Sequence, residues 1–435
     1  MPATHDTAAV LAIGDELTLG EAVDTNSAWI ARRLARRGVR AAVHQTLPDD
    51  RRAIAGALRQ LAGRCGLIVS TGGLGPTDDD LTRPALAEAL AEPLVEDAGA
   101  LARLEARFRE IGRDLLGANR VQAMRPASAR SIPNEQGTAP GLAATIVQAG
   151  RACDVICLPG PPREMRPMFE AHVEPALRPS GNRVIAGRDL HELGLPESVI
   201  PERLGGLMRR GRNPVVGTAA KTSFVTCKIR FEGPAAQAPA ALDDAERRVR
   251  EALAPYIFGA GDDTLASVVV GLLRERGETV ATAESCTGGM IAQWLTEVAG
   301  ASEVFVGGAV AYSNEMKSAC LGVPAAVIAA HGAVSEPVAR AMADGALARC
   351  AEAGRPATHA LAVTGIAGPG GSAPGKPVGT VWVCRATAGE PADARLFHFP
   401  GDRDTVRERA ACAALGMLRL RLIGRADARL LWERA

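Results

Sequence analysis

The segment AAVLAIG, residues 8–14, is an apolar run that ends in glycine. An apolar run without polar alternation is typical of a parallel strand that is buried on both faces of its sheet. Residues 26–37 then carry apolar side chains at helical spacing, and Gly38 ends this second segment. The sequence therefore predicts that the chain opens with the strand and helix of an α/β fold.

The same alternation continues toward residue 178. A second strand over 39–47, a second helix over 49–63 and a third strand over 66–73 follow in order. This order predicts a doubly wound α/β domain over residues 1–178, in which ligands bind at the carboxyl ends of the strands. Two turns rich in glycine and acids follow predicted strands and are expected at that edge: GDELTLGE (14–21) and TGGLGPTDDD (71–80).

Two further domains are predicted after the first. Residues 179–258 contain three segments that resemble strands: NRVIAGRDL (182–190), VVGTAA (215–220) and SFVTCKIRFEG (223–233), the last of which alternates in period two. Together with two helical segments, they indicate a small α+β module. Residues 259–435 return to alternating strands and helices and close with a long helix over 403–422. We expect a second α/β domain there.

Composition narrows the class of protein. The chain has 435 residues, with 50 basic and 49 acidic side chains and a net charge of +1. Neither nucleic acid nor an anionic membrane is expected as a partner, because no broad field of one sign is present. No apolar run approaches the roughly 18 residues of a membrane span. The 9 cysteines contain no CxxC pair, so structural zinc is not expected. We expect the cysteines to be free thiols in a reducing cytoplasm.

Polar and glycine-rich segments follow three predicted strands of the C-terminal domain: AESCTGG (283–289), AYSNEMK (311–317) and TGIAGPGG (364–371). Glycines let a ligand approach the backbone, and a helix that begins after them offers free N–H groups to an anion or an oxyanion. A buried Lys317 would be a base near neutral pH. Arg403, in GDRD (401–404), is a candidate phosphate ligand.

Each of these segments also has a purely structural interpretation. Ser285 or Thr287 would make an ordinary helix N-cap, and a single lysine is usually a solvated surface charge. The glycine-rich loop would be a flexible turn, and the segment around Arg403 would be an exposed cap. On chemistry alone, Cys286 is a rival to Ser285 as a nucleophile.

Six strings of the C-terminal domain resemble the PncC-type nicotinamide-nucleotide amidase domain of the CinA family: AESCTGG, YSNEMK, HGAVSEPV, TGIAGPGG, KPVGTVW and GDRDTVR. The resemblance implies a serine–lysine amidase that converts nicotinamide mononucleotide and water to nicotinate mononucleotide and ammonia, without metal or cofactor. It makes Ser285 the nucleophile, with Lys317 and Tyr312 as activating partners. The oxyanion is expected on N–H groups around Thr287 to Gly289. The substrate-binding residues that it implies are Thr287, Gly288, Gly289, Ser302, Thr364, Gly365, Gly368 and Arg403.

The N-terminal domain resembles the molybdopterin-binding fold of MoaB and MogA in its CinA version, through GDE (14–16), GGLGPTDDD (72–80), NEQGTAPG (134–141) and LPGPPREM (158–165). The resemblance implies an ADP-ribose pyrophosphatase that uses Mg, Mn or Co, although the same fold also hosts adenylyl transfer. Asp78 to Asp80 would alternatively cap a helix. The implied nucleotide and metal site comprises Asp15, Glu16, Asn26, Gly72, Gly73, Gly75, Thr77, Asp78, Asp79 and Glu135, with Asp15, Asp78 and Asp79 as candidate metal ligands.

The middle module resembles the KH-like domain of the same family, but it lacks the GxxG loop that clamps nucleic acid. We interpret it as a spacer or dimerisation element, and the resemblance implies a homodimer. The leading hypothesis is a cytoplasmic bifunctional hydrolase. Two alternatives stay open: one domain is catalytically silent and regulates through nucleotide binding, or the protein is a non-enzymatic partner in DNA uptake.

Overall fold

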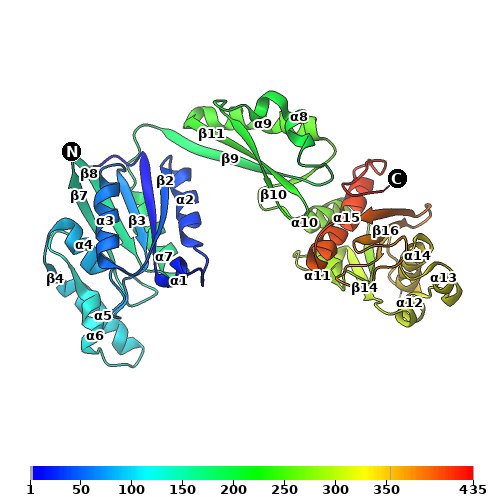
Figure 1. Cartoon of the computed structure of the whole chain (residues 1–435), viewed down its shortest axis with the longest axis horizontal. Coiled ribbons are helices and arrows are strands. Elements are labelled where there is room, and N and C mark those ends of the chain that lie inside the picture. The colour runs from blue at the N-terminus through cyan, green and yellow to red at the C-terminus, as the bar shows by residue number, and fades with distance from the viewer. Residues whose placement is uncertain (1–2, 353, 435) are drawn as a thin grey trace. The chain divides into compact units, whose positions relative to one another are not determined.

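The computed structural model describes residues 3–352 and 354–434, which form two compact units. Of the described residues, the first unit holds 3–186 and 231–240, and the second holds 187–230, 241–352 and 354–434. Figure 1 shows the elements of both along the chain. In the described part of the chain, no helix is both long enough and apolar enough to cross a membrane.

The sheet of the first unit has the strand order β2-β1-β3-β8-β7-β6. Its parallel strands are β1 (Thr7–Ile13), β2 (Arg40–Leu47), β3 (Leu67–Thr71) and β8 (Arg151–Leu158). Two antiparallel strands, β7 (Gly141–Gln148) and β6 (Arg130–Ile132), extend one edge. The predicted α/β class is confirmed, with this antiparallel edge added.

Helices cover both faces of that sheet, as Figure 1 shows. On one face, Leu11 packs in a core that also holds Ile54 of α3 (Arg51–Ala62) and Leu86 of α4 (Thr82–Leu90). On the other face, Val10 shares a core with residues of α2 (Asn26–Arg36) and α7 (Pro162–Met168). Alternate residues of β1 therefore enter opposite cores, which explains its uninterrupted apolar run.

Between α4 and the antiparallel edge, the chain makes an excursion that the sequence analysis did not assign. It contains β4 (Leu94–Glu96), α5 (Ala98–Glu110), α6 (Gly117–Arg120) and β5 (Met124–Pro126). β4 pairs with β5 in a small sheet of its own. The remaining short helix of this unit, α1 (Asp15–Thr18), follows β1 directly.

Most of the middle module belongs to the second unit, and its sheet has the order β10-β11-β9-β12. Its strands are β9 (Arg183–Glu192), β10 (Val215–Ala220), β11 (Val225–Pro234) and β12 (Ile257–Ala260), and its helices are α8 (Val199–Leu204) and α9 (Ala238–Leu253). The first three strands lie in the three segments that were predicted to be strands. β12 falls at the expected domain boundary and was not predicted.

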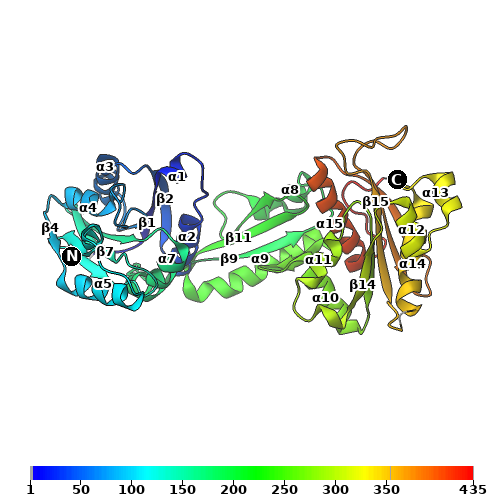
Figure 2. The same ribbon diagram turned by 90° about the horizontal axis from the view of Figure 1, so that it is seen from below.

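The C-terminal sheet has the order β14-β13-β15-β16-β17. β13 (Val280–Glu284), β14 (Phe305–Val310) and β15 (His359–Gly365) are parallel, and β16 (Thr380–Thr387) and β17 (Asp393–His398) are antiparallel. Figure 2 shows helices on both faces. α10 (Leu265–Arg276), α11 (Met290–Thr296) and α15 (Arg403–Leu422) share one core, and α12 (Asn314–Leu321), α13 (Ala325–His331) and α14 (Glu336–Glu352) share another.

Glu192, at the end of β9, is a buried carboxyl that leads to a pH prediction. Burial raises its pKa to about 8, and one of its oxygens accepts from the Leu195 N–H at 2.6 Å. Its other oxygen has no hydrogen-bond partner among the described residues. Because the folded-state pKa is raised, the neutral Glu192 contributes fully to stability below the unfolded-state pKa of about 4.5. This contribution is lost as the pH rises through about 8.

We therefore expect Glu192→Gln to become progressively more stable than the wild type between pH 5 and 8, by on the order of 1 kcal/mol per pH unit. Thermal unfolding at several pH values measures this difference. Glu251→Gln, an exposed position on α9, is the control and should leave the pH profile unchanged. A parallel profile for Glu192→Gln and the wild type would contradict burial of the neutral acid.

Candidate functional site

Ser285 lies in the loop that joins β13 to α11, at the carboxyl end of the parallel strands. Its N–H donates to the carbonyl of Val363 on β15 at 3.0 Å, and its own carbonyl accepts from the Gly288 N–H at 3.1 Å. Gly288 and Gly289 have φ of +63° and +94°, which side chains rarely tolerate. The glycines thus allow the tight turn that holds Ser285 at the sheet edge.

Lys317 of α12 reaches the same point from the neighbouring strand end. Its Nζ donates to Ser285 Oγ at 3.0 Å, to the Ala311 carbonyl at 3.0 Å and to the Tyr312 carbonyl at 3.2 Å. Lys317 is 2% exposed and Ser285 is 7% exposed. Burial lowers the pKa of Lys317, because the charged ammonium loses its hydration. The surface-lysine interpretation is therefore wrong.

Cys286 is buried in the apolar core that α10, α11 and α15 share. Burial raises the pKa of its thiol to about 12, which keeps it protonated. Because the thiolate is the reactive form of cysteine, this environment disfavours Cys286 as the nucleophile.

Glu284, the last residue of β13, is a site residue that the sequence analysis missed. Its carboxylate is 1% exposed and accepts from the N–H groups of Gly289, Ile291 and Ala292 at 3.0, 3.1 and 2.9 Å. These are N–H groups that an α-helix leaves unpaired in its first turn. An acidic residue just before a glycine turn and a helix was the available signal.

The contacts of Glu284 reduce the number of N–H groups that are free to bind an oxyanion. The N–H of Gly289 is bound to Glu284, and the N–H of Gly288 is bound to the Ser285 carbonyl. Within residues 3–352 and 354–434, the Thr287 N–H has no acceptor, so it is the donor of the expected set that stays available. The Thr287 hydroxyl is likewise buried without a partner in this part of the chain.

Tyr312 and Arg403 meet at the exposed side of the site. Arg403 donates to the Tyr312 hydroxyl at 2.8 Å and to the carbonyl of Gly368 at 2.7 Å. Tyr312 is 59% exposed, and its contact with Lys317 is through its carbonyl, not its hydroxyl. The expectation that the Tyr312 hydroxyl activates Ser285 is therefore not supported, whereas Arg403 and the glycine loop are brought together as expected.

The remaining expected substrate residues divide into two groups. The Thr364 hydroxyl donates to the carbonyl of Ala333 at 2.8 Å, and a Cβ at Gly365 would lie 2.6 Å from Val381, so both support the packing of the loop. Ser302 lies in the turn Ala301–Glu303 before β14. Because β14 runs parallel to β13, that turn is at the amino end of the strands, opposite to Ser285. The structure does not bring Ser302 to this site.

The N-terminal unit has a cavity of about 580 Å³ at the carboxyl ends of β1 and β3. Asn26 lines the cavity, and its side-chain amide donates to the Gly160 carbonyl at 2.7 Å. The side-chain oxygen Oδ1 of Asn26 is buried without a partner among the described residues. A Cβ at Gly72 would lie 2.1 Å from the Ile13 carbonyl oxygen, which explains the glycine. The expected residues that line the cavity are Glu16, Asn26, Gly72, Gly73, Gly75, Thr77 and Asp79.

Asp15, Asp78 and Glu135 are not among the residues that line this cavity. Asp15 is instead engaged with Asp49: each backbone N–H donates to the other side chain, at 3.0 and 3.1 Å. Asp49 does line the cavity and was not predicted. Burial raises the pKa of Asp49, and repulsion from Asp15, Glu16 and Asp79 adds to the rise.

Asp80 and Glu164 also line the cavity and were missed. Asp80 accepts from the N–H groups of Gly75 and Thr77 at 2.7 and 2.9 Å, which holds the glycine-rich loop, so it is not a helix cap. Glu164 accepts from the side-chain amide of Asn134 at 2.8 Å. The contact between Asn134 and Glu164 joins segments 30 residues apart in the chain, so local patterns could not reveal it.

The expected metal ligands do not assemble. Among the described residues, no three His, Cys, Asp or Glu side chains are grouped as a metal site, so Asp15, Asp78 and Asp79 do not form one. Mg²⁺ at a diphosphate commonly takes one or two carboxylates and completes its shell with phosphate oxygens and water. Glu16, Asp49 and Asp79, which line the cavity, fit that more open arrangement.

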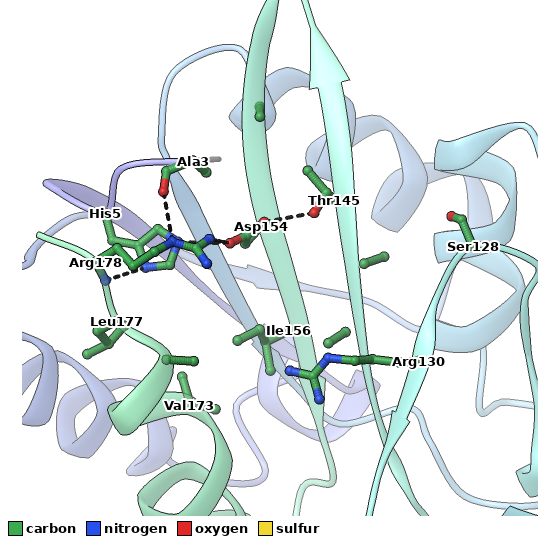
Figure 3. Close-up of a pocket in the computed structure, with 14 residues that line it drawn as sticks. Ala3, His5, Ser128, Arg130, Thr145, Asp154, Ile156, Val173, Leu177 and Arg178 are labelled. Carbon is green, nitrogen blue, oxygen red and sulfur yellow. Dashed lines mark hydrogen bonds and ion pairs between the residues drawn. The ribbon is translucent and has the colours of Figure 1, made fainter. Parts of the chain in front are cut away.

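A separate cavity of about 520 Å³ lies beside β7 and β8 of the N-terminal unit (Figure 3). Asp154 accepts from His5 Nε2 at 3.0 Å, from Thr145 at 2.8 Å and from Arg178. His5 Nδ1 accepts from the Arg178 N–H at 3.1 Å, so both ring nitrogens are engaged. This network ties the start of the chain to β8 and leaves no free base.

Three family models match separate parts of the chain. Residues 9–179 match the model of a "Probable molybdopterin binding domain", residues 187–259 that of the "Damage-inducible protein CinA KH domain", and residues 262–422 that of the "CinA C-terminal domain". A CinA-like protein of Anaeromyxobacter sp. (strain Fw109-5) is 45% identical over 416 residues, which cover 95% of this chain and 98% of that one. The chain belongs to the CinA family.

Other members of the CinA family are similarly related. A CinA-like protein of Gemmatimonas aurantiaca is 42% identical over 415 residues, covering 94% of this chain and 95% of that one. A crystal structure of the protein CinA from Thermoplasma acidophilum is 35% identical, with a TM-score of 0.36, and covers 39% of this chain and 97% of that one. The predicted family and its MoaB/MogA-like, KH-like and C-terminal parts are thus confirmed.

The contacts of Glu284 lead to a testable expectation. Glu284→Ala leaves the N–H groups of Gly289, Ile291 and Ala292 without their acceptor, which should lower the free energy of unfolding by on the order of 3 kcal/mol. Amide hydrogen exchange at these residues should accelerate. Glu275→Ala, an exposed position on α10, is the matched control. Unchanged exchange at α11 would show that Glu284 does not hold the helix start.

Proposed function

We propose that the C-terminal domain is an amidohydrolase that converts nicotinamide mononucleotide to nicotinate mononucleotide and ammonia through a serine acyl-enzyme. The observation that carries this proposal is the 3.0 Å contact between Lys317 Nζ and Ser285 Oγ in a buried environment. A hydroxyl nucleophile needs an adjacent base, and a lysine with a lowered pKa is such a base. The choice of substrate rests on the family resemblance.

The contacts support a simple sequence of proton transfers. Neutral Lys317 accepts the Ser285 proton as Oγ attacks the carboxamide carbon, and the free Thr287 N–H would stabilise the oxyanion. The ammonium of Lys317 then protonates the leaving nitrogen as the C–N bond breaks, which releases ammonia. Water next attacks the ester carbon, gives its proton to Lys317, and Ser285 Oγ leaves with that proton.

Arg403 supports a phosphate-bearing substrate. Its guanidinium lies at the exposed side of the site, between the Tyr312 hydroxyl and the glycine-rich loop. Neither contact is to a carboxylate, so the charge is not neutralised there. A guanidinium is suited to binding a phosphate group through paired hydrogen bonds. We assign Arg403 to the phosphate and Tyr312 to its orientation.

Ammonia release from nicotinamide mononucleotide tests the amidase directly. We expect release by the wild type and a loss on the order of 10³-fold or more in Ser285→Ala and in Lys317→Ala, because nucleophile and base act as a unit. Lys228→Ala, an exposed lysine on β11, is the control and should retain activity. In the wild type, kcat/KM should rise with pH and level off below the usual lysine pKa, since the neutral amine is the active form.

Two outcomes would contradict this proposal. Activity that survives in Ser285→Ala and is lost in Cys286→Ala would show that Cys286 is the nucleophile. Absence of ammonia release by the folded wild type would leave the C-terminal domain as a nucleotide-binding regulator, which is the alternative with one silent domain.

We further propose that the N-terminal domain is a metal-dependent ADP-ribose pyrophosphatase. The cavity at the ends of β1 and β3 supports it, because glycines that permit close approach lie beside Glu16, Asp49 and Asp79. Glu16 and Asp49 would hold the divalent ion, which would neutralise the diphosphate and activate water. The glycine-rich loop held by Asp80 would allow the diphosphate to approach the backbone closely.

Chelation separates the two proposed activities. EDTA should abolish cleavage of ADP-ribose to AMP and ribose 5-phosphate, Mg, Mn or Co should restore it, and ammonia release from nicotinamide mononucleotide should be unaffected. Asp49→Asn should reduce metal-dependent cleavage at least about tenfold, because it removes a ligand charge. Equal loss of both activities on chelation would contradict two independent sites.

The cellular setting is also a proposal. The cysteines in the described part of the chain are all free, which supports a reducing cytoplasm. We propose a homodimer on the basis of the family resemblance. A role in DNA uptake without catalysis is the remaining alternative, and a DNA affinity that falls steeply with salt would favour it.

A further inference from the structure

The second unit contains a cavity of about 690 Å³ that is separate from the Ser285–Lys317 pair. It lies where the middle module packs on the C-terminal domain. Its walls come from β9, β12, the loop before β11, the start of α10, and the helices α11 and α15. A volume of this size accommodates a small organic molecule.

Aromatic rings form one wall of this cavity. Phe224 and Phe258 meet edge to face at a centroid distance of 5.5 Å, and His191 lies 5.5 Å from Phe224 and 5.7 Å from Phe258. Trp294 of α11 also lines the cavity. The ammonium of Lys221 lies 4.9 Å from the centre of the Phe224 ring, so one aromatic face already attracts a cation of the chain itself.

Carboxylates dominate the charge of the lining. Asp262, Asp263, Glu297 and Glu408 line the cavity, and Lys221 is the one lysine or arginine among the described lining residues. In the described part of the chain, none of these four carboxylates forms an ion pair. Glu408 accepts from the Ser223 hydroxyl at 2.8 Å, and Asp263 accepts from the Ala260 N–H at 2.8 Å. The cavity therefore presents a negative field beside aromatic faces.

We propose that this cavity is a binding site for a flat organic cation, of the class of an N-alkylated aromatic heterocycle. Aromatic faces attract such a cation through their quadrupole, and the unpaired carboxylates add charge attraction at short range. A phosphate-bearing ligand would be repelled by the same carboxylates. A bare metal ion is not favoured, because no three ligand side chains converge among the described residues. Binding here does not depend on either proposed activity.

Calorimetric titration of the full chain with 1-methylquinolinium tests the proposal, because this probe has no carboxamide or phosphate for the amidase site. Neutral quinoline at pH 8 is the matched probe without charge. We expect the cation to bind at least about tenfold more tightly than quinoline, with weaker binding as salt is raised. Glu408→Gln, which keeps an acceptor for Ser223, and Phe224→Leu should each weaken binding about fivefold.

Glu275→Gln on α10 lies outside the lining and should bind like the wild type. Circular dichroism of each variant checks that the fold is retained. Equal affinity for quinoline and 1-methylquinolinium, unchanged binding in Glu408→Gln and Phe224→Leu, or no binding at millimolar concentration would each overturn the proposal.

Discussion

Burial of the Lys317 amine beside Ser285 is the constraint on which the C-terminal site depends. Removing a lysine from water favours its neutral form, and that form is a base. The groups that accept from Nζ are a hydroxyl and two backbone carbonyls, so no carboxylate holds the proton on the amine among the described contacts. The adjacent ends of β13 and β14 bring these groups together, since the Ala311 N–H donates to the Glu284 carbonyl at 2.8 Å.

Features that depend on local sequence patterns could be predicted from the sequence. The apolar run of β1 is buried on both faces, and the strand ends near Ser285 and Lys317 lie side by side because parallel strands share an edge. The family resemblance supplied the roles of Ser285 and Lys317, and the structure adds their distance and burial. The burial of Cys286 distinguishes it from Ser285 as a candidate nucleophile. This burial could not be predicted from the sequence, because it depends on how the core packs.

Other features depend on contacts between distant segments, which local patterns do not encode. Asp15 was expected to bind metal, but it is engaged by Asp49, a residue that follows a different strand. The family resemblance implied that Ser302 contacts substrate, yet it precedes β14, which runs parallel to β13, and so lies at the opposite edge from Ser285. Asp80 differs, because its contacts are local: it accepts from the N–H groups of Gly75 and Thr77 in its own loop and is not a helix cap.

The carboxylate of Glu284 has a consequence for how a charged molecule enters the site. A helix start after a glycine turn ordinarily attracts phosphate, because its N–H groups and its dipole favour negative charge. In this protein a buried side chain already fills that position at α11. An anionic group would therefore gain little at this helix start, because Glu284 already occupies its N–H groups. A ligand with one charged end and one neutral end would be favoured with its neutral end at Ser285 and its anionic end at the guanidinium of Arg403.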